Sequence, residues 1–74
     1  VSPRDIFIDA LKYQAVYIVL LHNHPSGNPE PSKADILLTK RVEEAGKTLG
    51  IRLSDHIILG NNCFVSLVER GIIE

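Results

Sequence analysis

The side chains best suited to chemistry in this 74-residue chain are two histidines with one residue between them and an aspartate beyond the following loop. His22 and His24 directly follow the apolar run 15–21, and Asp35 follows a loop with three prolines. Because alternate side chains of an extended strand project to the same side, both imidazoles are expected to face one way. Two imidazoles and one carboxylate can bind a divalent metal ion and leave coordination positions open, as catalytic metal sites do.

Asp35 has two roles that the sequence leaves open. Ser32 is a typical helix N-cap, and an acidic residue three positions later completes a capping box. Asp35 is also in phase with the inward face of the helix predicted for residues 32–49. The apolar members of that face are Leu38, Val42, Ala45 and Leu49. A buried ionised carboxylate is costly unless it is paired, and a metal cation would pair it. Without a metal, the two histidines would be partly buried rings held by backbone hydrogen bonds.

Zinc is the metal that this pattern favours. Bound zinc would lower the pKa of a water molecule to about 7 and polarise a carbonyl group, which makes amide hydrolysis feasible near neutral pH. Such a site also needs a general base, usually a glutamate. The Ser32 hydroxyl could donate a hydrogen bond to the oxyanion as it forms, or serve only as the helix cap. Two histidines and one carboxylate also suit non-haem iron, but the close His-x-His followed by a helical aspartate fits zinc better.

The elements that would position these residues follow an α/β pattern. Ser2-Pro3-Arg4-Asp5 combines an N-cap, a proline in the first turn and an acidic third residue, which is a strong helix start. The predicted elements are a helix from this start to about Tyr13, a buried strand at 15–21, a helix at 32–49 that stops at Gly50, a hairpin of strands at 56–59 and 63–65, and one helical turn at 66–70. This order predicts a mixed sheet with flanking helices.

The remaining histidine and the single cysteine are predicted to have no part in the site. His56 follows Asp55 at the start of a strand, and nothing in the sequence places it near the first two histidines, so a structural or surface role is favoured over metal binding. Cys63 lies beside a turn and is interpreted as a small apolar strand residue. One cysteine excludes an internal disulfide framework and a four-cysteine zinc site, and its free thiol fits a cytoplasmic setting.

The composition excludes several partners for these residues. Eight lysines and arginines against nine aspartates and glutamates give a net charge of -1, so no basic surface for nucleic acid is expected. No segment is long enough to cross a membrane, and the start lacks a signal-peptide pattern. The chain contains no methionine, which indicates that Val1 is an internal residue of something longer or follows a removed segment.

The spacing of the candidate ligands resembles a known motif. His22-x-His24, seven residues and Ser32-x-x-Asp35 is similar to the JAMM signature of the MPN (JAB1) metallopeptidase superfamily. The wider segments 21–32, 55–60 and 64–67 resemble the RadC family within it, and the similarity covers essentially all 74 residues. The resemblance implies zinc at the two histidines and the aspartate, assistance by Ser32 at the oxyanion, and hydrolysis of peptide or isopeptide bonds in a peptide or protein substrate. It also implies an α/β sandwich related to that of cytidine deaminases.

The chain departs from the family pattern at the general base. JAMM enzymes place a catalytic glutamate on a strand upstream of the first helix, and this chain begins at that helix. None of its glutamates is assigned as the base; they are Glu30, Glu43, Glu44, Glu69 and Glu74. With the absent methionine, this predicts that residues 1–74 are the C-terminal portion of one RadC-like JAB/MPN domain, truncated at its N-terminus, which binds zinc without the base required for catalysis.

Two further expectations follow from the resemblance and the truncation. RadC-like proteins carry a label of DNA repair, so a repair-associated accessory module without hydrolase activity is the alternative function. Strand edges left exposed by truncation would invite pairing, which predicts a homodimer.

Overall fold

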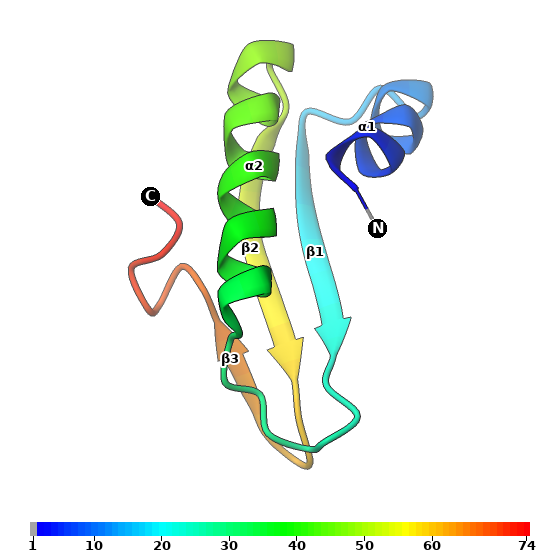
Figure 1. Ribbon diagram of the computed structural model, residues 1–74. Helices are drawn as coiled ribbons and strands as arrows, with labels where there is room; N and C mark the ends of the chain where they lie inside the picture. Colours follow the sequence, from blue (N-terminus) through cyan, green and yellow to red (C-terminus); the bar gives the residue numbers. More distant parts are fainter. Residues whose placement is uncertain (1) are drawn as a thin grey trace.

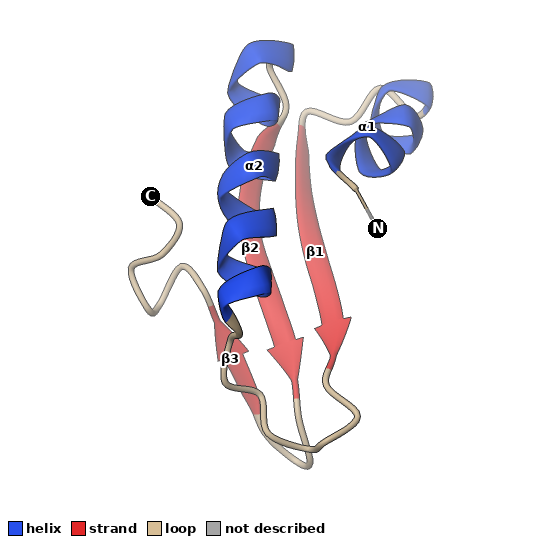
Figure 2. Ribbon diagram, in the orientation of Figure 1, coloured by secondary structure: helices blue, strands red, loops and turns tan. Residues whose placement is uncertain are grey.

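The computed structural model describes residues 2–74 as one layer of helices against one sheet. The elements in chain order are α1 (Pro3–Lys12), β1 (Tyr17–Asn23), α2 (Lys33–Leu49), β2 (Arg52–Leu59) and β3 (Phe64–Ser66). The strand order is β1-β2-β3; β1 pairs parallel with β2, and β3 pairs antiparallel with β2. Helix α2 lies along one face of the sheet, and α1 lies near the start of β1 (Figures 1 and 2). The predicted mixed sheet with flanking helices is confirmed.

The helix ends follow the local signals in the sequence. The Ser2 hydroxyl accepts a hydrogen bond from the Asp5 amide at 3.3 Å and caps α1. Ser32 caps α2, and Gly50 ends it in the left-handed conformation, with φ +73°. Neither helix of the described chain is long and apolar enough to span a membrane.

The strand boundaries differ from the prediction because they depend on pairing between distant segments. β1 begins at Tyr17 and extends to Asn23, so it includes His22. β2 begins at Arg52, four residues before the predicted 56, because its polar first half pairs with β1 across a register shift between Ile18 and Val19. β3 is displaced by one residue from 63–65 and forms the predicted hairpin with β2.

The segment after β3 forms a single turn, as predicted. The Arg70 amide donates to the Ser66 carbonyl at 3.1 Å, and the Ser66 hydroxyl accepts from the Glu69 amide at 3.2 Å. Gly71 follows with φ +75° and ends the turn. Cys63 lies just before β3 and is exposed, so its interpretation as a strand residue was wrong by one position.

The prediction that the first strand is fully buried was wrong for one of its faces. Ile18 and Leu20 pack against the core, whereas Tyr17, Val19 and Leu21 are more than half exposed. The reason is that α2 covers only one face of the sheet, as Figure 2 shows. The apolar core lies between the helices and the sheet and includes residues of the C-terminal segment. It consists of Phe7, Ala10, Val42, Ile51, Leu53, Ile58, Leu67 and Ile73.

The inward face of α2 is rotated slightly from the predicted stripe. Its buried residues are Asp35, Thr39, Val42 and Gly46. Leu49, predicted to be inward, is 44 % exposed. Gly46 accounts for the rotation, because a Cβ at this position would lie 2.2 Å from the Ile51 carbonyl oxygen. The helix therefore turns its smallest residue toward the chain that enters β2.

Candidate metal centre

The three candidate ligands meet at one edge of the sheet. Parallel pairing puts the carboxyl ends of β1 and β2 at the same edge, and α2 starts there after the proline-rich loop (Figure 1). His22 and His24 come from the end of β1, and Asp35 comes from the first turn of α2. One ligand atom from each residue lies within 4.8 Å of the others. The structure thus brings the three side chains together, and their role as metal ligands stays a prediction.

The carboxylate lies between the two imidazoles. Oδ1 of Asp35 is 3.1 Å from Nδ1 of His22, and Oδ2 is 3.0 Å from Nε2 of His24. The two rings stand nearly perpendicular, at 87°, with centroids 4.8 Å apart. The Asp35 side chain is 7 % exposed, that of His24 16 % and that of His22 45 %. The cluster is therefore closed on the Asp35 side and open to solvent on the His22 side.

The hydrogen bond on the far side of His24 fixes which nitrogen faces the carboxylate. Nδ1 of His24 lies 2.9 Å from the Asn28 carbonyl oxygen. Because a carbonyl oxygen can only accept, the hydrogen is assigned to Nδ1. In the neutral ring Nε2 then carries a lone pair that points at a carboxylate oxygen of Asp35, and either a proton on Nε2 or a metal ion between the two atoms makes this contact favourable. Metal-binding histidines commonly have this arrangement, with the outer nitrogen donating to a backbone carbonyl.

Asp35 is a helix-capping residue and a member of the cluster at once. Its Oδ2 accepts from the Ser32 amide at 2.8 Å, and its own amide donates to the Ser32 hydroxyl at 3.0 Å. Burial raises the pKa of the Asp35 carboxyl, but the hydrogen bonds from Ser32 and the two nearby imidazoles lower it by more. The pKa therefore lies below its ordinary value, and the group is an anion at neutral pH.

Ser32 is where the capping box requires it. Its hydroxyl oxygen accepts from Asp35, a bond that leaves the hydroxyl hydrogen free to be donated elsewhere. Ser32 is exposed beside the cluster. Its predicted role at an oxyanion stays a prediction.

The loop between the histidines and α2 is held by the β2–β3 turn and by the C-terminal turn. The Gly27 carbonyl accepts from the Asn61 amide at 2.8 Å, and a Cβ at Gly60 would lie 2.5 Å from that carbonyl oxygen. Glu30 and Arg70 form a two-pronged ion pair at 2.7 and 2.9 Å. The hydrogen bond from Arg70 lowers the pKa of the Glu30 carboxyl. These contacts join the loop to segments far away in sequence.

His56 lies next to the cluster, contrary to the sequence-based expectation. Its ring is nearly parallel to that of His22, at 19°, with centroids 6.0 Å apart, and the residue is 2 % exposed. The parallel pairing of β1 with β2 places it there, opposite Leu20. Burial, followed by the nearby His22, lowers the pKa of His56. It lies outside the group of three ligand-type side chains.

Thr39 is a site neighbour that the sequence analysis missed. Its hydroxyl donates to the Asp35 carbonyl oxygen at 2.7 Å and lies 2.8 Å from Nδ1 of His56. The residue is fully buried. The available signal was a polar residue one helical turn after Asp35, in phase with the inward face.

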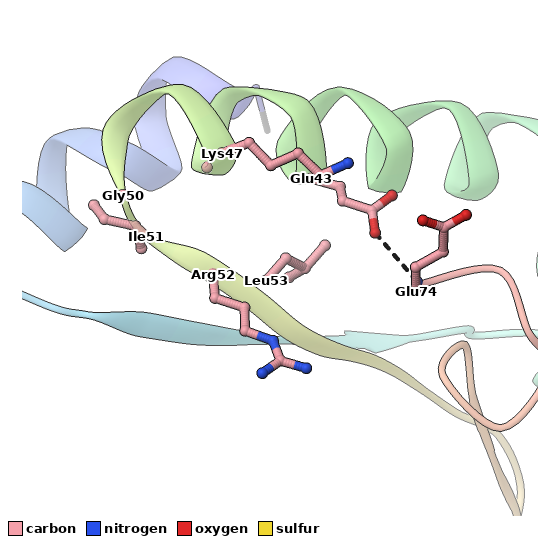
Figure 3. A pocket seen from close by; sticks show the side chains of 8 residues that line it. Glu43, Lys47, Gly50, Ile51, Arg52, Leu53 and Glu74 are labelled. Atoms are coloured by element: carbon pink, nitrogen blue, oxygen red, sulfur yellow. Dashed lines mark hydrogen bonds between the residues drawn. The ribbon is translucent and has the colours of Figure 1, made fainter.

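The cavities of the described chain differ in their relation to the cluster. A cavity of about 170 Å³ adjoins the cluster and is lined by His22, His56, Leu20, Leu21, Leu38 and Ile6. A larger one, about 320 Å³, lies along the C-terminal half of α2, where Glu43, Lys47, Arg52 and Glu74 contribute charged groups (Figure 3). In it the Glu74 amide donates to the Glu43 carboxylate. None of the candidate ligands lines this larger cavity.

Comparison with known proteins decides the family. Residues 1–72 match the family described as the RadC-like JAB domain. The chain belongs to this family. A UPF0758 protein of Shouchella clausii is 55 % identical over 71 residues, which is 96 % of this chain and 31 % of that protein. UPF0758 proteins of Pelobacter propionicus and Clostridium beijerinckii are 49 % and 55 % identical over 73 residues, 99 % of this chain and 32 % of each.

The RadC-like JAB chain spans about a third of the length of the curated relatives it matches. The predicted family resemblance is confirmed, and the α/β architecture agrees with it. The name UPF0758 states no activity.

Proposed function

We propose that this RadC-like JAB chain holds a zinc ion with His22, His24 and Asp35, and that the centre serves the hydrolysis of peptide or isopeptide bonds. The supporting observation is the convergence of one carboxylate and two imidazoles within 4.8 Å, with Nε2 of His24 directed at Asp35 by the bond from Nδ1 to Asn28. When bound, zinc activates a water molecule near neutral pH and polarises the carbonyl to be attacked.

Each residue of the chain contributes a distinct property to this centre. Asp35 supplies a negative charge that is held in place by the first turn of α2. His24 is fixed in one tautomer by the loop carbonyl. His22 stands on the exposed side, where a substrate would approach. We assign to Ser32 the donation of its hydroxyl hydrogen to the oxyanion, because it adjoins Asp35 and is exposed.

The general base is not assigned to any glutamate of the described chain. Glu30 is paired with Arg70, Glu43 with Lys40 and Glu44 with Lys47. Within residues 2–74 no glutamate joins the group formed by the two histidines and Asp35. We therefore expect the 74-residue chain to bind zinc but not to hydrolyse peptides unless other residues supply a base.

Zinc is preferred over iron because the family match agrees with the JAMM-like spacing of the ligands. The alternative of a DNA-repair accessory module finds no support in the charge of the chain, which has one more acidic than basic residue. A homodimer also remains a proposal. It would use the unpaired edge of β1 and the neighbouring uncovered face of the sheet, where Tyr17, Val19 and Leu21 are exposed, and its measure is the molar mass in solution by light scattering.

The test is a competition titration of the metal-free chain with zinc in the presence of a chromophoric chelator. We expect one tight site per chain in the wild type, and its loss in His22→Ala and His24→Ala. Glu30→Gln is the matched control, because it removes a charge from the same loop and Glu30 does not belong to the cluster. A folded wild type that takes up no zinc, or a His24→Ala variant that binds as tightly as the wild type, would contradict the proposal.

A further inference from the structure

Behind the three candidate ligands lies a buried polar pair, Thr39 and His56, beside a core of apolar side chains. Thr39 is fully buried and His56 is 2 % exposed. Buried polar side chains require hydrogen-bond partners, and an apolar pair could fill the same space without that requirement. The pair therefore calls for an explanation beyond filling volume.

The hydrogen bonds of the pair have a definite direction. Thr39 has one hydroxyl hydrogen, and it is donated to the Asp35 carbonyl oxygen at 2.7 Å. The contact of 2.8 Å between the same hydroxyl and His56 must then be a bond that Nδ1–H of His56 donates. His56 is thereby attached, through Thr39, to the helical turn that carries Asp35.

On its other side, His56 lies next to β1, the strand that carries His22. The His56 ring lies nearly parallel to the His22 ring, at 19° and 6.0 Å between centroids, and both line the same small cavity. His56 also belongs to β2, the strand that pairs with β1. One residue thus contacts the turn of Asp35 through a hydrogen bond and the ring of His22 through its face.

We propose that His56 is a positioning residue of the metal centre. Together with Thr39, it fixes the position of the helical turn that carries Asp35 relative to the plane of the His22 ring. The inference rests on the proposed zinc site and adds residues that do not themselves bind the metal. Groups that orient metal ligands from outside commonly change metal affinity by about 10–100-fold when removed. Because the link to Asp35 runs through its main chain, we expect an effect of about tenfold.

The experiment uses substitutions that separate the hydrogen bond from the packing. Thr39→Val keeps the shape of the side chain and removes the hydroxyl, whereas Thr39→Ser keeps the hydroxyl. His56→Leu removes the ring. Val42→Ala is the matched control, since it opens the buried face of the same helix seven residues after Asp35 and takes no part in the hydrogen bonds of the pair. For each variant, zinc affinity is measured by chelator competition, cobalt is used as a spectroscopic probe of site geometry, and the melting temperature is measured without metal.

We expect Thr39→Val and His56→Leu to weaken zinc binding about tenfold and to change the cobalt absorption spectrum. Thr39→Ser should retain both properties, and Val42→Ala should lower the melting temperature without altering either. If His56→Leu fails to fold, the isosteric Thr39→Val carries the test alone. Wild-type affinity and spectrum in a folded Thr39→Val variant would overturn the inference, as would equal weakening in Val42→Ala. A wild type that binds neither zinc nor cobalt would instead contradict the zinc site itself.

Discussion

Two aspartates of this domain, the buried Asp35 and the half-buried Asp55, accept several hydrogen bonds each, and their partners differ in kind. Asp55, in β2, accepts from the Ser66 hydroxyl at 2.6 Å, from the His56 amide at 2.7 Å and from the Val68 amide at 3.1 Å. All three donors carry permanent hydrogens. Asp35, in α2, has one such donor from the backbone, the Ser32 amide, and otherwise faces two imidazole nitrogens.

The difference shows what marks a buried carboxylate as a candidate ligand. Asp55 is satisfied by the protein alone, and its bonds attach β3 and the following turn to β2. Asp35 has a single permanent donor in the Ser32 amide, and its other neighbours are imidazole nitrogens, which can either donate a hydrogen to the carboxylate or bind a metal ion beside it. The nature of the groups that surround a carboxylate therefore distinguishes a candidate ligand from a structural residue, in addition to its burial.

The largest expected effect is the difference in zinc affinity between variants of the two aspartates. Asp35→Asn should weaken zinc binding by more than about 100-fold, beyond the range typical of residues outside the ligand set. Asp55→Asn should leave zinc affinity unchanged, because Asp55 does not belong to the cluster. Isothermal titration of both variants with zinc measures the difference. Similar losses in the two variants would remove the distinction drawn between them.

The next effect concerns the stability that Asp55 confers. Asp55→Ala should lower the free energy of unfolding by about 2 kcal/mol, because three donors lose a charged acceptor and two of them lie at the β3 junction. Urea denaturation of the metal-free chain, followed by circular dichroism, is the measurement. A variant as stable as the wild type would show that Asp55 does not stabilise the turn after β3.

The serines beside the two aspartates, Ser32 and Ser66, are expected to give smaller changes in stability. Ser32→Ala removes the cap of α2 and should cost about 1 kcal/mol of stability. Zinc affinity should be retained, because the bond to the Asp35 carboxylate comes from the Ser32 amide. Ser66→Ala is the matched change at Asp55, where the hydroxyl itself is the donor. Denaturation measures the stability of both variants, and zinc titration measures their affinity. A loss of zinc binding in Ser32→Ala would contradict the claim that the Ser32 hydroxyl is not needed to hold the Asp35 carboxylate.

The smallest effect is a dependence of stability on pH. Because the pKa of Asp35 is lowered in the folded chain, its ionised form stabilises the fold above the unfolded pKa of about 3.9. This contribution is lost as the pH falls through the lower folded value. In the presence of a chelator, the stability difference between wild type and Asp35→Asn should therefore shrink below about pH 4. Unfolding curves from neutral to acidic pH test this, and a constant difference would show that Asp35 confers no such stability.

The sequence predicted those features whose causes are local. The ends of both helices follow from a serine cap and, for α2, a terminal glycine, each of which acts within one turn. The spacing of the histidines and Asp35 was likewise readable, because a strand end and a helix start joined by a short loop meet at one edge of the sheet.

What the sequence did not predict depends on contacts between distant segments. The early start of β2 at Arg52 needs β1 as its partner, and its polar first residues gave no strand pattern. The proximity of His56 to His22 depends on that same pairing. The true inward face of α2, with Thr39 on it, depends on the close approach of Gly46 to Ile51.

Anomalous diffraction at the zinc absorption edge, from crystals of the zinc-loaded chain, tests the central claim most directly. We predict one zinc ion between His22, His24 and Asp35, with ligand distances of about 2.0–2.2 Å. Zinc found only elsewhere, for example at the exposed thiol of Cys63, would contradict the account, above all if the imidazoles kept their direct contacts with Asp35.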